Sequence, residues 1–268
     1  YRGENIRILW FFLYHGIVYL MVLGLASIFK KDKNFWFSGR FWLEFAIGFL
    51  ILSYSRAFYQ YKDICQVVPE EICSFTYRTV REAGKLLLVL IPLMILGLVT
   101  RKRGEERLYG LTRKGFDLKP YMIMLGIMAV LILAASFMEH FTDYYPKYKR
   151  VKGDAFADYF NLPNIVPVLI YEGTYGMGFI SVELFFRGFL IIGLSRYLGT
   201  KALLPMAATY AVLHFGKPMG ETISSIFGGY ILGVIALRTR NIWGGVFIHV
   251  GIALLMEFFA FFQTGLKP

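Results

Sequence analysis

The stretch Ser181-Val-Glu-Leu-Phe-Phe-Arg-Gly188 places an acid and a base inside a long apolar segment. Glu183 and Arg187 are four residues apart, so a helix presents both side chains on one face, about one turn apart. A carboxylate and a guanidinium are costly at membrane depth, and such groups usually face a protein-lined or watery cavity and mark function. The pair therefore predicts a functional site within a membrane helix.

The composition around this stretch is that of a membrane protein. The chain of 268 residues is 57% hydrophobic and 18% charged, whereas typical soluble domains are about a quarter charged. Its apolar residues gather in runs long enough to cross a bilayer. We expect an all-α polytopic protein with a single transmembrane domain over residues 1–268. About eight spans are predicted, at residues 8–29, 41–59, 86–100 with an extension back to 81, 120–138, 164–197, 202–215, 221–237 and 241–262.

The predicted spans fall into two halves. Residues 1–140 hold spans 1 to 4, which carry few ionisable groups at depth. Residues 164–262 hold spans 5 to 8, which carry the motifs described below. We therefore expect the chemistry of the protein to lie in its second half.

The formal net charge of +11 comes mostly from Lys and Arg between the apolar runs, and segment 101–119 alone has seven of them. At these places basic residues contact anionic headgroups and fix topology, so we expect membrane lipids, and no nucleic acid, as partners. Cys65 and Cys73 do not form a metal-binding or redox spacing, and we expect them to be thiols rather than a disulfide.

The second half of the chain holds several ionisable side chains within or at the edges of predicted spans. They are Glu172, Glu183, Arg187, His214, Glu221, His249 and Glu257, and Tyr210 precedes His214 by four residues. The fifth, sixth and eighth spans thus each present a proton-active side chain at middle depth. One Glu and two His from three helices are enough to bind and activate a water molecule.

Two chemistries would use such a set. A buried Glu can act as general base while histidines hold an oxyanion. Alternatively, Glu183, His214 and His249 can ligate a divalent metal such as zinc that polarises water. The residues alone also fit a polar network that holds helices together, or a proton- or ion-coupled transporter.

Three short segments favour the hydrolase. Glu183-Leu-Phe-Phe-Arg187-Gly188, Tyr210-Ala-Val-Leu-His214 and then His249 resemble, in this order, the motifs of the CPBP family of CAAX proteases and bacteriocin-processing enzymes, also called the ABI family. That family's pattern is Glu-Glu-x-x-x-Arg, Phe-x-x-x-His and His-x-x-x-Asn on successive helices. The resemblance covers roughly residues 173–257. It implies a CAAX-protease-like bundle of eight helices that acts as an intramembrane protease on hydrophobic or prenylated peptides.

Carried over residue by residue, the resemblance assigns the catalytic set to Glu183, Arg187, His214 and His249. Glu183 would activate water, with or without a metal, and the two histidines would stabilise the oxyanion. The accessory residues would be Glu172, Tyr210, Glu221 and Glu257. The resemblance also implies a multi-pass protein of a bacterial or archaeal inner (plasma) membrane.

Two positions depart from the family pattern. Val182 stands where the family has the first Glu of the pair, and Ala253 stands where it has Asn. Either Glu183 does the work with one of the accessory carboxylates, or the chain is a catalytically silent member that binds peptide or lipid, as an immunity protein would.

Overall fold

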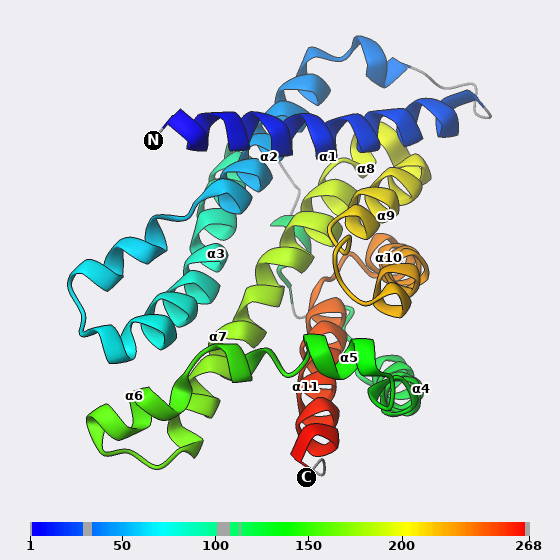
Figure 1. The fold of residues 1–268 in the computed structure, drawn as a ribbon. Coiled ribbons are helices and arrows are strands. Elements are labelled where there is room, and N and C mark those ends of the chain that lie inside the picture. Colours follow the sequence, from blue (N-terminus) through cyan, green and yellow to red (C-terminus); the bar gives the residue numbers. More distant parts are fainter. Residues whose placement is uncertain (1, 29–33, 101–107, 113, 266–268) are drawn as a thin grey trace. The chain divides into compact units, whose positions relative to one another are not determined.

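The computed structural model describes residues 2–28, 34–100, 108–112 and 114–265, and every regular element in these ranges is helical (Figure 1). The α-helices are α1 (Arg2–Ile28), α2 (Gly39–Ala57), α3 (Glu70–Thr100), α4 (Lys119–Ser136), α5 (Glu139–Tyr144), α6 (Gly153–Phe160), α7 (Ile165–Glu183), α8 (Ser195–Leu198), α9 (Leu203–Val212), α10 (Met219–Thr239) and α11 (Trp243–Gly265). A π-helix, η5 (Leu184–Gly193), continues α7, and 3-10 turns form η1 (Asn34–Phe37), η2 (Gln60–Gln66), η3 (Leu108–Gly110), η4 (Lys147–Arg150) and η6 (Gly199–Ala202).

The predicted all-α polytopic architecture is confirmed. Among the described residues, seven helical segments are long and apolar enough to cross a bilayer, so the chain is a multi-pass integral membrane protein. The predicted spans at 164–197 and 202–215 lie almost wholly within one helical segment of 48 residues, Ile165–Val212, which accounts for the difference of one from the predicted number. Eight residues of the basic segment 101–119, namely 101–107 and 113, lie outside the described part of the chain, and they include five of its seven Lys and Arg residues.

Local chemistry explains several helix boundaries. The Ser38 hydroxyl accepts a hydrogen bond from the Phe41 amide at 3.3 Å and caps α2. Asn161 adopts the left-handed conformation, φ 52°, that ends α6. Pro218 precedes α10, whose first turn contains Glu221 at the positive end of the helix dipole. The prediction that Glu221 opens the seventh span is thus confirmed.

The chain divides into two compact units. The first unit comprises residues Tyr1–Phe58, Leu88–Phe116 and Ser181–Gly245. The second comprises residues Tyr59–Leu87, Asp117–Ile180 and Val246–Pro268. The prediction of a single transmembrane domain stays a prediction.

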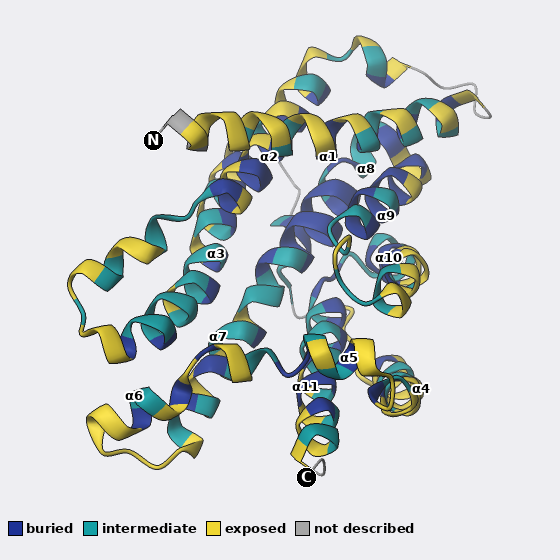
Figure 2. Cartoon of the chain, in the orientation of Figure 1, coloured by how far each residue is buried: buried dark blue, intermediate teal, exposed yellow. Residues whose placement is uncertain are grey.

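The core of the first unit is built around η5. Phe185, Phe186 and Phe189 are at most 1% exposed, and Figure 2 shows this segment as an almost unbroken buried stretch. Gly188 makes a close approach possible, since a methyl group there would lie 2.8 Å from the backbone oxygen of Tyr109 in η3. Residues 183–193 thus lie in the core of the first unit, where close packing holds the polar pair in place.

The second unit has two smaller apolar cores. In one, Phe141 and Tyr145 pack with Met256 of α11. In the other, Phe75 of α3 packs with Val151 and with Tyr171 of α7. The segment between α4 and α7 contains two short helices, α5 and α6, and the 3-10 turn η4.

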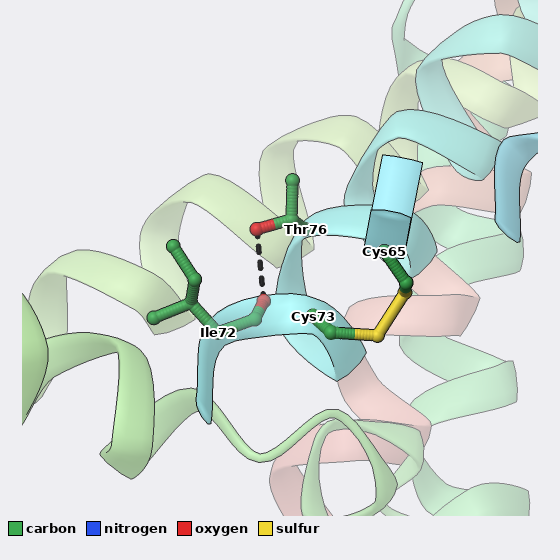
Figure 3. The surroundings of a disulfide bond; sticks show 4 residues. All are labelled: Cys65, Ile72, Cys73 and Thr76. Atoms are coloured by element: carbon green, nitrogen blue, oxygen red, sulfur yellow. Dashed lines mark hydrogen bonds between the residues drawn. A yellow bond between two sulfur atoms is a disulfide. The ribbon is translucent and has the colours of Figure 1, made fainter. Parts of the chain in front are cut away.

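The structure corrects the prediction for the two cysteines. Cys65 in η2 and Cys73 in the first turns of α3 form a disulfide, with their Cα atoms 5.0 Å apart (Figure 3). The turn through Pro69 reverses the chain and brings together two thiols that are eight residues apart in the sequence. The spacing of the two cysteines alone does not show where the chain reverses, so the sequence did not predict the bond.

Reduction of this disulfide is expected to lower the free energy of unfolding in detergent by about 2 to 3 kcal/mol, because a short closed loop loses that much constraint on the unfolded chain. Thermal unfolding with and without reductant measures the change. The Cys65→Ser/Cys73→Ser variant should unfold at the same temperature as the reduced protein, and reductant should not change that temperature. Equal unfolding of the wild-type protein in both conditions would contradict the bond.

Candidate functional site

Glu183 and Arg187 form an ion pair inside the first unit, as their spacing predicts. Arg187 Nη1 lies 2.8 Å from Glu183 Oε1, and the two side chains are 1% and 0% exposed. Glu183 ends α7 and Arg187 lies in η5, so the pair stands where the α-helix widens into a π-helix. Such π-helical turns are frequent at functional sites because they re-aim side chains.

The Glu183 carboxylate is also held by close packing against the first turn of α11. A methyl group built on Gly245 would lie 1.9 Å from Glu183 Oε2 and 2.6 Å from its carboxyl carbon. Only glycine at position 245 leaves room for the carboxylate. Gly245 is therefore a residue of the site that the sequence did not point to, since it lies 62 positions after Glu183 and carries no functional group.

Arg187 connects this pair to α9. Its guanidinium carbon lies 4.5 Å from the centroid of the Tyr210 ring, within cation–π range. The Tyr210 ring meets the His214 ring edge-on, with centroids 4.6 Å apart. The structure thus brings Glu183, Arg187, Tyr210 and His214 into one continuous polar line in the first unit.

His214 is fixed in a defined orientation. Its Nδ1 lies 3.0 Å from the Tyr210 carbonyl oxygen. Because a carbonyl oxygen can only accept, Nδ1 carries the proton, and Nε2 is the basic nitrogen of the neutral ring. The Thr222 hydroxyl donates to the His214 carbonyl at 2.8 Å and ties α9 to the start of α10.

Glu221 lies at the far end of the same line. Its Oε1 is 3.8 Å from His214 Nε2 and accepts a hydrogen bond of 2.6 Å from Lys217 Nζ. The Glu221 and His214 side chains keep 15% and 11% of their surface exposed, unlike the fully buried Glu183. Lys217 is a second residue missed by the sequence reasoning, although its i, i+4 spacing from Glu221 was visible.

The remaining predicted residues form a separate group in the second unit. The His249 ring stacks on Phe179 of α7, with centroids 5.7 Å apart and planes at 15°. The Glu257 carboxylate accepts hydrogen bonds from the backbone amides of Lys147 at 2.9 Å and Tyr148 at 3.2 Å. Glu257 therefore anchors the segment before α6, which is a structural role.

Glu172 belongs to this second group as well. It is half-buried on α7, and Glu257 and Lys147 are the ionisable groups near it. The Lys147 ammonium donates to the Tyr175 hydroxyl at 2.9 Å and lies 4.8 Å from the centroid of that ring. Glu172 thus lies beside a cation on the same unit, and we assign it no part in the line that contains Glu183.

The predicted metal ligands fit a metal ion poorly. Among the described residues, neither unit contains a group of three or more His, Cys, Asp or Glu side chains that could hold a metal. The Glu183 carboxylate already pairs with the Arg187 cation, which competes with a metal ion for the same oxygens. The metal set of Glu183, His214 and His249 stays a prediction, and the chemistry proposed below uses side chains and water.

Comparison with known proteins identifies the part of the chain that carries these residues. The model of the family "Type II CAAX prenyl endopeptidase Rce1-like" matches residues 165–255. Residues 165–255 form an Rce1-like CAAX endopeptidase domain. No curated protein and no solved structure matches the chain significantly.

The Rce1-like domain runs from the start of α7 into α11. It contains the whole polar line of the first unit, as well as His249 and both departures from the motif, Val182 and Ala253. Glu257 lies just beyond it. The resemblance inferred from three short motifs is therefore confirmed over the second half of the chain.

Proposed function

We propose that the chain is an intramembrane endopeptidase that hydrolyses a hydrophobic or prenylated peptide. The observation that carries the proposal is the buried polar line from the Glu183–Arg187 pair through Tyr210 to His214, which lies within the Rce1-like domain. A buried ion pair is costly within a membrane, and such pairs usually mark a functional site. Here the pair also contacts the ring that packs against an oriented histidine.

The proposed reaction needs a base, an oxyanion site and water. His214 takes a proton from water through Nε2, and the hydroxide attacks the peptide carbonyl carbon to form a tetrahedral oxyanion. The oxyanion is stabilised by a hydrogen-bond donor, a role that the family resemblance gives to His249. The C–N bond then breaks, and the proton taken by His214 passes to the leaving amine.

Arg187 and Glu183 hold His214 in position through Tyr210. The guanidinium lies against the Tyr210 ring, so it fixes the turn of α9 that carries His214. Glu183 fixes the guanidinium in turn. In this proposal both residues position His214, and neither needs to be open to solvent.

The test uses purified protein in proteoliposomes with a prenylated peptide and its unprenylated counterpart. We expect the wild-type protein to cleave the prenylated peptide. The Glu183→Ala and His214→Ala variants should cleave it about 100-fold more slowly, or slower still. His140→Ala is the matched control, because His140 is an exposed histidine on α5. Unchanged cleavage in both site variants would contradict the proposal.

The alternative is a catalytically silent member of the family that binds peptide or lipid. Val182 and Ala253, which replace a carboxylate and an amide of the family pattern, favour it. A wild-type protein that binds the prenylated peptide without cleaving it, and a Val182→Glu variant that gains cleavage, would support this alternative.

A further inference from the structure

We propose that Glu221 replaces the carboxylate missing at position 182 and, together with His214, holds the water that attacks the peptide bond. The inference rests on the proposed endopeptidase function and names the carboxylate partner of its base. This carboxylate lies in the first turn of α10, whereas the family motif has its first Glu at position 182, near the end of α7.

The geometry of Glu183 argues against that residue as the partner. Its side chain is fully buried, one carboxylate oxygen pairs with Arg187, and the other lies against Gly245. A water molecule needs at least two polar partners and room to enter. Glu183 offers neither room nor access, so it acts as a positioning residue for Arg187.

The register of α9 against the α7–η5 segment shows what is missing at position 182. Phe186 meets the Tyr210 ring edge-on, with centroids 5.2 Å apart. After η6 the chain turns back, so that α9 runs in the direction opposite to η5 (Figure 1). Val182 lies about one turn before Phe186, and His214 lies one turn after Tyr210, so the two positions face each other. A carboxylate at position 182 would therefore lie next to His214, where this chain has an apolar, half-buried side chain packed on the core.

Glu221 supplies a carboxylate to the same histidine from another helix. Its Oε1 lies 3.8 Å from His214 Nε2, which is too far for a direct hydrogen bond. With the proton on His214 Nδ1, both Nε2 and the Glu221 carboxylate can accept, so a water molecule that donates one hydrogen to each bridges the two side chains. Water held between two bases in this way is oriented to lose a proton as it attacks.

The surroundings hold Glu221 in place. Lys217 Nζ donates a hydrogen bond to Glu221 Oε1 at 2.6 Å, and the Thr222 hydroxyl donates one to the His214 carbonyl. These two bonds fix the turn between α9 and α10. The partial exposure of His214 and Glu221 gives water access that Glu183 lacks. The segment from His214 to Glu221 thus contains both water-binding groups within eight residues.

The activity test compares two changes at the carboxylate. Glu221→Gln should lower kcat/KM for the prenylated peptide by about 100-fold, because the neutral amide is a much weaker base and hydrogen-bond acceptor than the carboxylate. Adding Val182→Glu to Glu221→Gln should recover at least about 10-fold, since it restores a carboxylate beside His214. Glu139→Gln, at an exposed acid of α5, is the matched control and should leave kcat/KM unchanged. A Glu221→Gln variant that cleaves within about threefold of wild type overturns the inference.

A second readout does not depend on activity. An experimental structure of the wild-type protein in lipid should show a water molecule about 2.6–3.2 Å from both His214 Nε2 and a Glu221 carboxylate oxygen. Direct contact between the two side chains, with no room for water, overturns the inference. If the wild-type protein cleaves no peptide, the proposed function fails, and the presence or absence of this water still decides whether the pair is a water-binding site.

Discussion

Replacing Arg187 by methionine is expected to lower the free energy of unfolding by about 3 to 5 kcal/mol, the usual cost of leaving one charge of a buried pair without its partner. Both members of the pair are almost completely buried, at 1% and 0% exposure. Methionine fills much of the volume of arginine, so the loss comes from the uncompensated Glu183 carboxylate rather than from a cavity. Chemical or thermal unfolding in detergent micelles measures it.

The control for this prediction removes both charges. Glu183→Gln/Arg187→Met should recover a large part of the lost stability, because no buried charge remains. Arg238→Met makes the same change at an exposed arginine of α10 and should alter stability by less than about 0.5 kcal/mol. Equal effects of Arg187→Met and Arg238→Met would show that the pair is not buried as described.

Replacing Gly245 by alanine is expected to lower kcat for the prenylated peptide by about 100-fold, the effect of moving a supporting group by about 1 Å. The new methyl group would lie 1.9 Å from Glu183 Oε2, so the carboxylate at the end of a flexible side chain has to move. Its displacement weakens the ion pair that fixes Arg187 and, through Tyr210, His214. The substitution removes no polar group, so a loss of activity would come from the displacement of the Glu183 carboxylate.

Two variants separate this effect from general destabilisation. Gly228→Ala on α10 adds a methyl group with no atom within 4 Å and should leave kcat unchanged. Glu183→Asp in the Gly245→Ala background shortens the acid by one methylene and should recover part of the activity. A kcat for Gly245→Ala within about threefold of wild type would contradict the assigned role of the Glu183 position.

The parts of the site that depend on local spacing were predictable from sequence. Glu183 with Arg187 and Tyr210 with His214 are i, i+4 pairs, and helical geometry alone places each pair on one face. The order of these pairs along the chain carried the family resemblance, which the match over residues 165–255 confirms. Charge and apolar run length likewise predicted a polytopic helical protein.

The parts that depend on contacts between distant segments were not predictable. Gly245 packs on Glu183 only because α11 begins beside the end of α7, and a glycine carries no signal of its own. The disulfide depends on a turn at Pro69 that periodicity does not reveal. Glu221 resembled a helix-capping acid in sequence, and its distance to His214 became informative only with the turn between α9 and α10 in three dimensions.

The central claim is that this chain hydrolyses a peptide bond within the membrane with His214 as the base. The most direct measurement is mass spectrometry of a prenylated peptide incubated in ¹⁸O-labelled water with wild-type and His214→Ala proteoliposomes. We predict cleavage by the wild-type protein with one labelled oxygen in the new C-terminal carboxyl group, at a rate at least about 100-fold above that of His214→Ala. An intact peptide with the wild-type protein, or equal cleavage rates for the two proteins, would contradict the claim.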